Sequence, residues 1–197
     1  MSFSLGLTGS IGMGKSTTAK LFAAGDCAVW DADAAVHRLY SAGGAAVQAM
    51  KTAFPDAIGD DAVNRAVLKR IIGENPDALK HIEAIVHPLV AQDRAEFRKE
   101  AQNDILVFDI PLLFETGGDA EMDAVACVFV DAETQKERVL ARGTMTVEQF
   151  EHILQKQMPI EEKRARADYV IETDTLEHAQ AQVAAILADI RSKQVNA

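Results

Sequence analysis

The segment that decides the fold is Gly9-Ser10-Ile11-Gly12-Met13-Gly14-Lys15-Ser16, which reads G-x-x-x-x-G-K-S and follows an apolar run at residues 3–7. This spacing is typical of a phosphate-binding P-loop. Its glycines let backbone N–H groups turn inward, and a helix beginning near Lys15 adds its positive end to the same hollow. We predict that this segment, with Thr17, binds a polyphosphate. Lys15 would reach the β- and γ-phosphates and the Ser16 hydroxyl would ligate Mg²⁺.

Short apolar runs alternate with helical patterns along the chain, which predicts a parallel sheet with helices on both faces. The expected strands are residues 4–8, 27–30, 105–108, 125–130 and 169–171. A helical pattern follows the glycine-rich segment at Ala19, Leu21 and Phe22, so a chance glycine-rich turn is the less favoured interpretation of that segment. The predicted fold class is therefore α/β, a P-loop NTPase with a five-stranded parallel sheet.

The composition is that of one main domain with insertions: 197 residues, 48% of them hydrophobic and 25% charged. The chain shows no leader-like start and no apolar stretch long enough to cross a bilayer, so we expect a cytoplasmic protein with no membrane partner. Cys27 and Cys127 lie in apolar runs without metal-ligand spacing, and we expect buried free thiols.

The net charge of −10 argues against a nucleic-acid partner, because such surfaces need clustered positive charge. A small phosphorylated ligand is compatible with this charge, since a P-loop and a few converging arginines outweigh the overall field locally. The five histidines show no ligand spacing, so no structural metal is indicated.

A long stretch, 31–104, separates the second expected strand from the third, which is too much chain for a simple crossover. Its helical patterns predict an inserted helical subdomain over 32–102, in which the pair His87-Pro88 marks a helix break. A polar segment over 143–159 is predicted to form a mobile lid. The core of the single domain would then comprise 1–31, 103–142 and 160–197.

Two acidic residues, Asp31 and Asp33, follow the second expected strand at the sheet edge where the P-loop also lies. Asp33 there would face the transferred phosphate and accept the proton of an attacking hydroxyl. The alternative is that both residues cap the following helix. His37, one turn after Asp33, would border the acceptor site or be an ordinary surface histidine.

The run Ile105-Leu106-Val107-Phe108-Asp109 has the form of a Walker B strand, whose carboxylate would lie near Mg²⁺. The chain then turns at Pro111 and reaches Glu115, a carboxylate suited to a ligand pocket. The intervening Leu112, Leu113 and Phe114 would line that pocket, or simply belong to the core.

Arg138 and Arg142 lie four residues apart on one expected helix, so both guanidinium groups can point toward the P-loop mouth and clamp a phosphoryl group. The alternative is a solvated helix face paired with Glu137 and Asp131. Further basic groups are Arg65, Lys163, Arg164 and Arg166, which we interpret mainly as solvated surface.

Several motifs occur together in one order: the P-loop, Asp31-Ala32-Asp33, Ile85-Val86-His87-Pro88-Leu89, and Asp109-Ile110-Pro111-Leu112-Leu113-Phe114-Glu115. Residues later in the chain fit the same family pattern, namely Gln135, Arg138, Arg142, Gln157-Met158 and residues 167–171. With this set the chain resembles the dephospho-coenzyme A kinase family nearly end to end.

The resemblance implies a nucleoside-monophosphate-kinase-like core, an insertion that holds the coenzyme part and a mobile lid. It also implies transfer of the γ-phosphoryl group of ATP to the ribose 3′-hydroxyl of dephospho-coenzyme A, with Mg²⁺. Asp33 matches the family's proposed base, Lys15 and Ser16 its nucleotide and Mg²⁺ ligands, and Arg142 its lid arginine. The expected acceptor-binding residues are Asp33, His37, Arg65, His87, Asp109, Pro111, Leu112, Leu113 and Glu115.

Three places depart from the family pattern. Trp30 stands where a smaller aliphatic residue is usual, His152 where an arginine is frequent, and Glu172-Thr173 where Asp-Asn is common. None touches the P-loop or Asp33, so we expect altered affinities before lost activity. The alternatives are another small P-loop kinase with a different acceptor and, less favoured, a regulatory P-loop ATPase.

Overall fold

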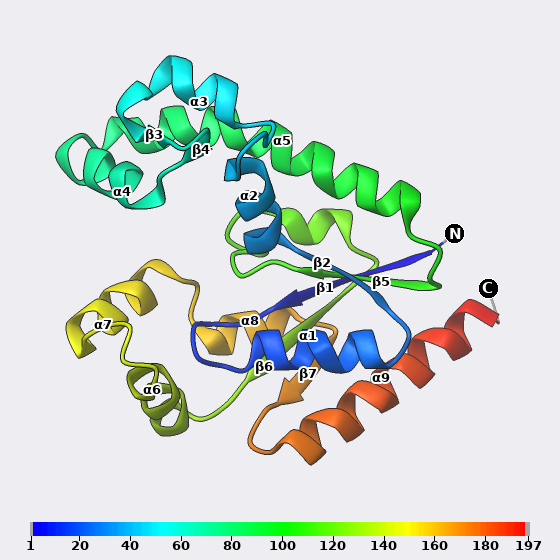
Figure 1. Cartoon of the computed structure of the whole chain (residues 1–197). Helices are drawn as coiled ribbons and strands as arrows, with labels where there is room; N and C mark the ends of the chain where they lie inside the picture. Colours follow the sequence, from blue (N-terminus) through cyan, green and yellow to red (C-terminus); the bar gives the residue numbers. More distant parts are fainter. Residues whose placement is uncertain (1, 196–197) are drawn as a thin grey trace. The chain divides into compact units, whose positions relative to one another are not determined.

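The computed structural model describes residues 2–195 and contains a five-stranded sheet with the strand order β2-β5-β1-β6-β7 (Figure 1). The strands are β1 (Phe3–Thr8), β2 (Ala28–Asp31), β5 (Ile105–Asp109), β6 (Ala124–Phe129) and β7 (Tyr169–Glu172). The pairs β1–β5, β1–β6 and β6–β7 are parallel. The predicted five-stranded parallel sheet is confirmed, with strand ends shifted by at most one residue.

Both faces of the sheet are buried, which explains why its strands are continuous apolar runs. Leu5, Leu7 and Val107 face one layer, where they pack with α1 (Lys15–Ala24) and α9 (Leu176–Val195). These two helices lie side by side (Figure 1). Val125 faces the opposite layer, where Leu113 and Phe114 cover it.

The order of the strands places the P-loop at the centre of the sheet. After β1 the chain forms β2 and β5 on one side, then β6 and β7 on the other. Strand β1 is therefore the switch point at which ligands of such folds bind, beyond the carboxyl ends of the strands. Gly9, Asp109 and Thr173 lie at or just after three of these ends.

The rest of this part of the chain consists of short helices. They are the 3₁₀ helix η2 (Gly118–Glu121) and the α-helices α6 (Ala132–Ala141), α7 (Val147–Lys156) and α8 (Ile160–Arg166). Helix α7 begins with a capping box, in which Thr146 and Gln149 each bond the other's backbone N–H. The polar segment 143–159 thus contains a helix with a well-defined start.

Residues Asp31–Glu100 form a second compact unit with its own hydrophobic core. Its elements are α2 (Ala32–Tyr40), α3 (Val47–Ala53), η1 (Pro55–Ala57), β3 (Ile58–Gly59), β4 (Ala62–Val63), α4 (Arg65–Glu74) and α5 (Asp77–Glu100). The antiparallel pair β3–β4 was not predicted, since two-residue strands leave no periodic pattern. Asp60 and Asp61 have φ angles of 51° and 57°, as a tight hairpin turn requires.

The predicted helix break at His87-Pro88 is wrong. Helix α5 continues through Pro88, which lies inside its 24 residues. A proline removes one backbone hydrogen bond from a helix. Ile82 and Val86 are buried in the core of this unit just before it, and this packing holds the helix together.

Both cysteines are buried free thiols, as predicted. Burial raises the pKa of Cys27 and of Cys127 to about 11, so each thiol stays neutral at physiological pH. Over residues 2–195, each helix is too short or too polar to traverse a lipid bilayer.

Candidate functional site

The P-loop has a backbone shape that glycine makes possible. Gly12 and Gly14 have φ angles of 79° and 83°, in the left-handed region. A Cβ atom at Gly12 would lie 2.5 Å from Val139 Cγ2, and one at Gly9 would lie 2.4 Å from Val128 Cγ2. The loop therefore curls tightly into the start of α1, whose first-turn N–H groups form an anion-binding end.

Lys15 and Asp109 meet at the carboxyl end of the central strands. Lys15 Nζ forms an ion pair with Asp109 Oδ1, and the Asp109 side chain is only 1% exposed. The parallel pairing of β1 with β5 brings them together, because Leu7 lies opposite Asp109 in the register. The acid that ends the Walker B-like strand thus lies beside the lysine of the P-loop.

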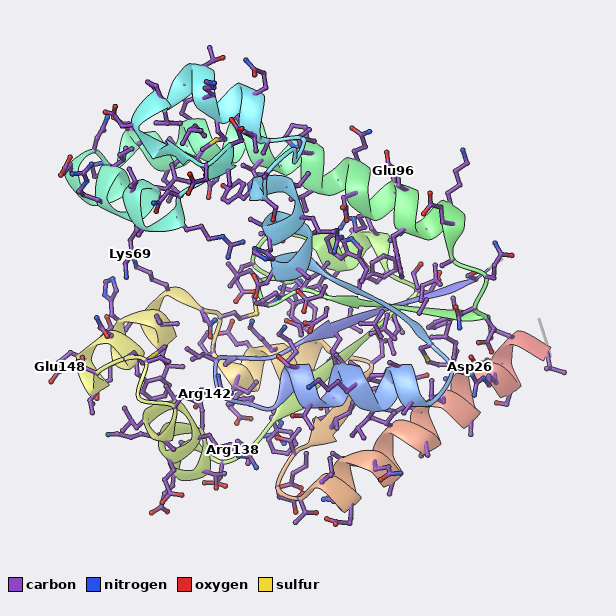
Figure 2. All side chains as sticks on the ribbon, in the orientation of Figure 1. Asp26, Lys69, Glu96, Arg138, Arg142 and Glu148 are labelled. Atoms are coloured by element: carbon purple, nitrogen blue, oxygen red, sulfur yellow. The ribbon has the colours of Figure 1, made fainter. Side chains whose placement is uncertain are left out.

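A cavity of about 430 Å³ opens beside the P-loop. Its lining comprises Gly12, Gly14, Thr17, Thr18, Arg138, Ala141, Arg142, Thr173, Thr175, Leu176 and Ala179. Arg138 and Arg142 both come from the end of α6, where Figure 2 labels them. The structure therefore brings the two predicted arginines and the P-loop glycines to one hollow, whose size suits a small-molecule ligand.

Arg138 is held in place by the end of β7. Its guanidinium donates to Thr173 O at 2.7 Å and to Thr173 Oγ1 at 3.2 Å. The same hydroxyl donates to Met13 O at 2.9 Å, so Thr173 connects the arginine to the P-loop. The expectation that this departure from the family pattern does not touch the P-loop is therefore wrong. Arg138 contacts Thr173 and not Asp131, whose carboxylate caps α6 by accepting from Thr134 N.

Two glutamine side chains hold the backbone of Ile11 from both sides. Gln135 Nε2 donates to Ile11 O at 2.7 Å, and Ile11 N donates to Gln157 Oε1 at 3.2 Å. Gln135 is buried on α6, and Gln157 is the C-cap of α7. Both glutamines belong to the residues that carry the family resemblance, but no contact to Ile11 was predicted for them, because a hydrogen bond between distant segments leaves no local pattern.

The turn after β5 is fixed through the carbonyl of Pro111. This oxygen accepts from Thr8 Oγ1 at 3.1 Å and from Lys163 Nζ at 3.0 Å. The Lys163 side chain is 0% exposed, so its interpretation as solvated surface is wrong. Lys163 lies on the face of α8 that packs on the sheet, whereas Arg164 and Arg166 beside it remain nearer the surface.

Glu115 is the anionic partner of Lys163. Its Oε1 lies 2.8 Å from Lys163 Nζ and accepts from Met158 N at 2.9 Å. Burial alone would raise the pKa of Glu115, but these hydrogen bonds outweigh it and hold the pKa below its ordinary value. Of the apolar residues before it, Leu113 and Phe114 are core, whereas Leu112 is 42% exposed.

Four of the predicted site residues belong to the second unit, namely Asp33, His37, Arg65 and His87. Asp31 is the N-cap of α2, where its side chain accepts from Ala34 N at 2.8 Å. Asp33 lies in the first turn with an exposed side chain and is not the capping residue. His37 and His87 are exposed, and the Arg65 guanidinium lies 5.6 Å from the centre of the Tyr40 ring.

A cluster of possible metal ligands lies at the start of α9. Ligand atoms of Glu172, Asp174 and His178 all lie within 4.8 Å of one another. Asp174 Oδ1 lies 2.7 Å from His178 Nδ1 and accepts from Thr175 N at 2.8 Å. These are contacts that order the beginning of a helix.

The chain is similar to known proteins over almost its whole length. The family model described as dephospho-CoA kinase matches residues 3–178. A dephospho-CoA kinase of Ruegeria pomeroyi is 70% identical over 197 residues, covering 100% of both chains. A solved structure from Thermus thermophilus is 33% identical with a TM-score of 0.85, covering 95% of this chain and 97% of that one.

A more distant structure supports the fold alone. The dephospho-CoA kinase of Campylobacter jejuni is 22% identical with a TM-score of 0.73, and the match covers 98% of this chain and 100% of that one. The fold is therefore shared beyond close sequence similarity.

We predict that Gly12→Ala weakens nucleotide binding by roughly tenfold or more, because a clash with Val139 and a left-handed φ together disturb the loop. The measurement is titration with a non-hydrolysable ATP analogue. Gly43→Ala is the matched control, since its φ is 76° but nothing lies within 4 Å of the added Cβ. Equal affinities in the two variants would contradict the prediction.

We predict that the stabilising effect of Glu115 depends on pH. Its pKa is lower in the folded chain than the unfolded value of about 4.3, so ionised Glu115 stabilises the fold above that pH. This stabilisation is lost as the pH falls through the folded pKa. In urea unfolding, the free-energy difference between the wild type and Glu115→Gln should shrink from about pH 7 to about pH 3. A free-energy difference that stays constant between these pH values would contradict the prediction.

Proposed function

The chain belongs to the dephospho-coenzyme A kinase family, and we propose that it transfers the γ-phosphoryl group of ATP to the ribose 3′-hydroxyl of dephospho-coenzyme A. The products are coenzyme A and ADP. The observation that carries this function is the family match over residues 3–178, with a P-loop and two arginines lining one cavity. Because the reaction consumes ATP, we place it in the cytoplasm.

The P-loop, Lys15 and Arg142 would bind and orient the triphosphate. Phosphoryl transfer passes through a loose transition state, so its rate depends on alignment and on stabilisation of charge at the phosphoryl oxygens. Lys15 supplies a positive charge at the loop, where it pairs with Asp109 in this structure. Arg142 supplies a second positive charge from the end of α6, where it lines the cavity beside the P-loop.

Ser16 and Asp109 would hold Mg²⁺. A hydroxyl and a carboxylate are the hard oxygen ligands that this ion prefers, so these side chains fit it. Ser16 lies in the first turn of α1 and Asp109 at the end of β5. When bound, the ion neutralises charge on the β- and γ-phosphates.

Asp33 would act on the acceptor. Its carboxylate would orient the 3′-hydroxyl and accept its proton as the phosphoryl group is transferred. Capping of α2 is accounted for by Asp31, so helix stability does not require an acid at position 33. The exposed carboxylate of Asp33 is available to a ligand.

We assign the acceptor to the insertion and to the turn after β5. The insertion, 32–102, contributes His37, Arg65 and His87, and the turn contributes Pro111 and the exposed Leu112. The segment 143–159 would close as a lid when both substrates are bound, which keeps water from the transferred group.

The function is tested by incubating the protein with Mg-ATP and, separately, dephospho-coenzyme A, AMP and a panel of small alcohols. We expect ADP release and a product of the mass of coenzyme A with dephospho-coenzyme A alone. Phosphorylation of another acceptor would indicate a different small-molecule kinase. Nucleotide binding with no phosphorylated product would indicate a regulatory ATPase.

We predict that Asp33→Asn lowers turnover by roughly 10²- to 10⁴-fold while ATP binding stays nearly unchanged, because only the proton acceptor is removed. The measurement is steady-state formation of coenzyme A together with titration of an ATP analogue. Asp31→Asn is the matched control: it removes a neighbouring charge, but asparagine still caps the helix. Similar turnover in the two variants would exclude Asp33 as the base.

A further inference from the structure

The most deeply buried charge on α8 belongs to Lys163, whose side chain is 0% exposed. The other basic residues of this helix form ion pairs nearer the surface, Arg164 with Glu161 and Arg166 with Asp119. An ammonium group loses its hydration on burial, and this costs several kcal/mol unless hydrogen bonds replace the water.

The partners of Lys163 are the two ends of one turn. Its Nζ donates to Pro111 O at 3.0 Å and lies 2.8 Å from Glu115 Oε1. A buried ion pair is seldom more stabilising than apolar side chains of the same volume. Stability alone therefore does not explain why a lysine occupies this position.

The turn that Lys163 holds is also fixed to β1, the strand that leads into the P-loop. Pro111 O accepts from Thr8 Oγ1 at 3.1 Å, and Ile110 N donates to Leu7 O at 3.0 Å. Thr8 is the last residue of β1. Residues 110–115 therefore have one defined position relative to the P-loop.

Through Glu115 the same cation fixes the segment that joins α7 to α8. Glu115 Oε1 accepts from Met158 N at 2.9 Å. The preceding residue, Gln157, accepts from Ile11 N of the P-loop at 3.2 Å. The pair Gln157-Met158 is thus bonded to the P-loop on one side and to the turn on the other.

We infer that Lys163 is a positioning residue for phosphoryl transfer: it holds the turn 110–115 and, through Glu115, the pivot Gln157-Met158 about which the lid closes. This inference rests on the proposed function, in which the turn contacts the acceptor and the segment 143–159 is the lid. The buried ammonium group of Lys163 then fixes both the turn 110–115 and the pair Gln157-Met158 in position relative to the P-loop.

The test compares Glu115→Gln with the double variant Lys163→Met and Glu115→Gln. The amide oxygen of glutamine still accepts from Met158 N, and the double variant buries no unpaired charge. Glu115→Gln is the reference, so that any effect of position 115 on the acceptor is common to both variants. In the double variant we expect a kcat 10- to 100-fold below that of Glu115→Gln, since a shift near 1 Å has such an effect. Affinity for an ATP analogue should change less than about threefold.

The matched control on the same helix is the double variant Arg164→Met and Glu161→Gln, which removes a more exposed ion pair and should leave kcat unchanged. Equal kcat in Glu115→Gln and in the Lys163 double variant would overturn the inference. A wild type that makes no coenzyme A would instead refute the proposed function, so the two failures are distinct.

A measurement on the wild type keeps the inference testable if the double variant does not fold. Hydrogen exchange is followed with and without an ATP analogue plus dephospho-coenzyme A. We expect the Met158 amide to be protected in both states, while amides of α7 gain protection when both ligands bind. Fast exchange of the Met158 amide in the free protein, or no change in α7, would contradict a pivot at this position.

Discussion

The tight curl of the P-loop at the end of β1 is the constraint on which the rest of the site depends. Two of its glycines, Gly12 and Gly14, have left-handed φ angles, and an added Cβ would contact Val139 and Gln135 at Gly12 and Thr173 at Gly14. Neighbouring elements therefore pack directly against the loop backbone. Strands and helices from distant parts of the chain surround the loop, so its backbone has the curled shape before a ligand binds.

Much of this arrangement could be predicted from the sequence, because the signals are local. The P-loop spacing, the five apolar runs and the acid at Asp109 each follow from residues adjacent in the chain, and the parallel register brings Lys15 and Asp109 together. The four-residue spacing of Arg138 and Arg142 likewise placed both on one side of α6, where they line one cavity.

The features that were missed depend on contacts between distant segments. The run Lys163-Arg164-Ala165-Arg166 is typical of a surface helix, and only the packing of α8 decides that its first residue is buried. Pro88 suggested a helix end, but the core around Ile82 and Val86 outweighs that local signal. Thr173 differs from the residue common in the family, yet its hydroxyl connects Arg138 to Met13.

The contacts to Ile11 also bear on how this sequence tolerates change. Gln135 and Gln157 both bond to the main chain of Ile11, through its carbonyl and its N–H. Every amino acid offers that carbonyl, and every one except proline offers the N–H. As far as these two hydrogen bonds are concerned, a substitution at position 11 other than proline keeps both, whereas a substitution of either glutamine by an apolar residue removes one.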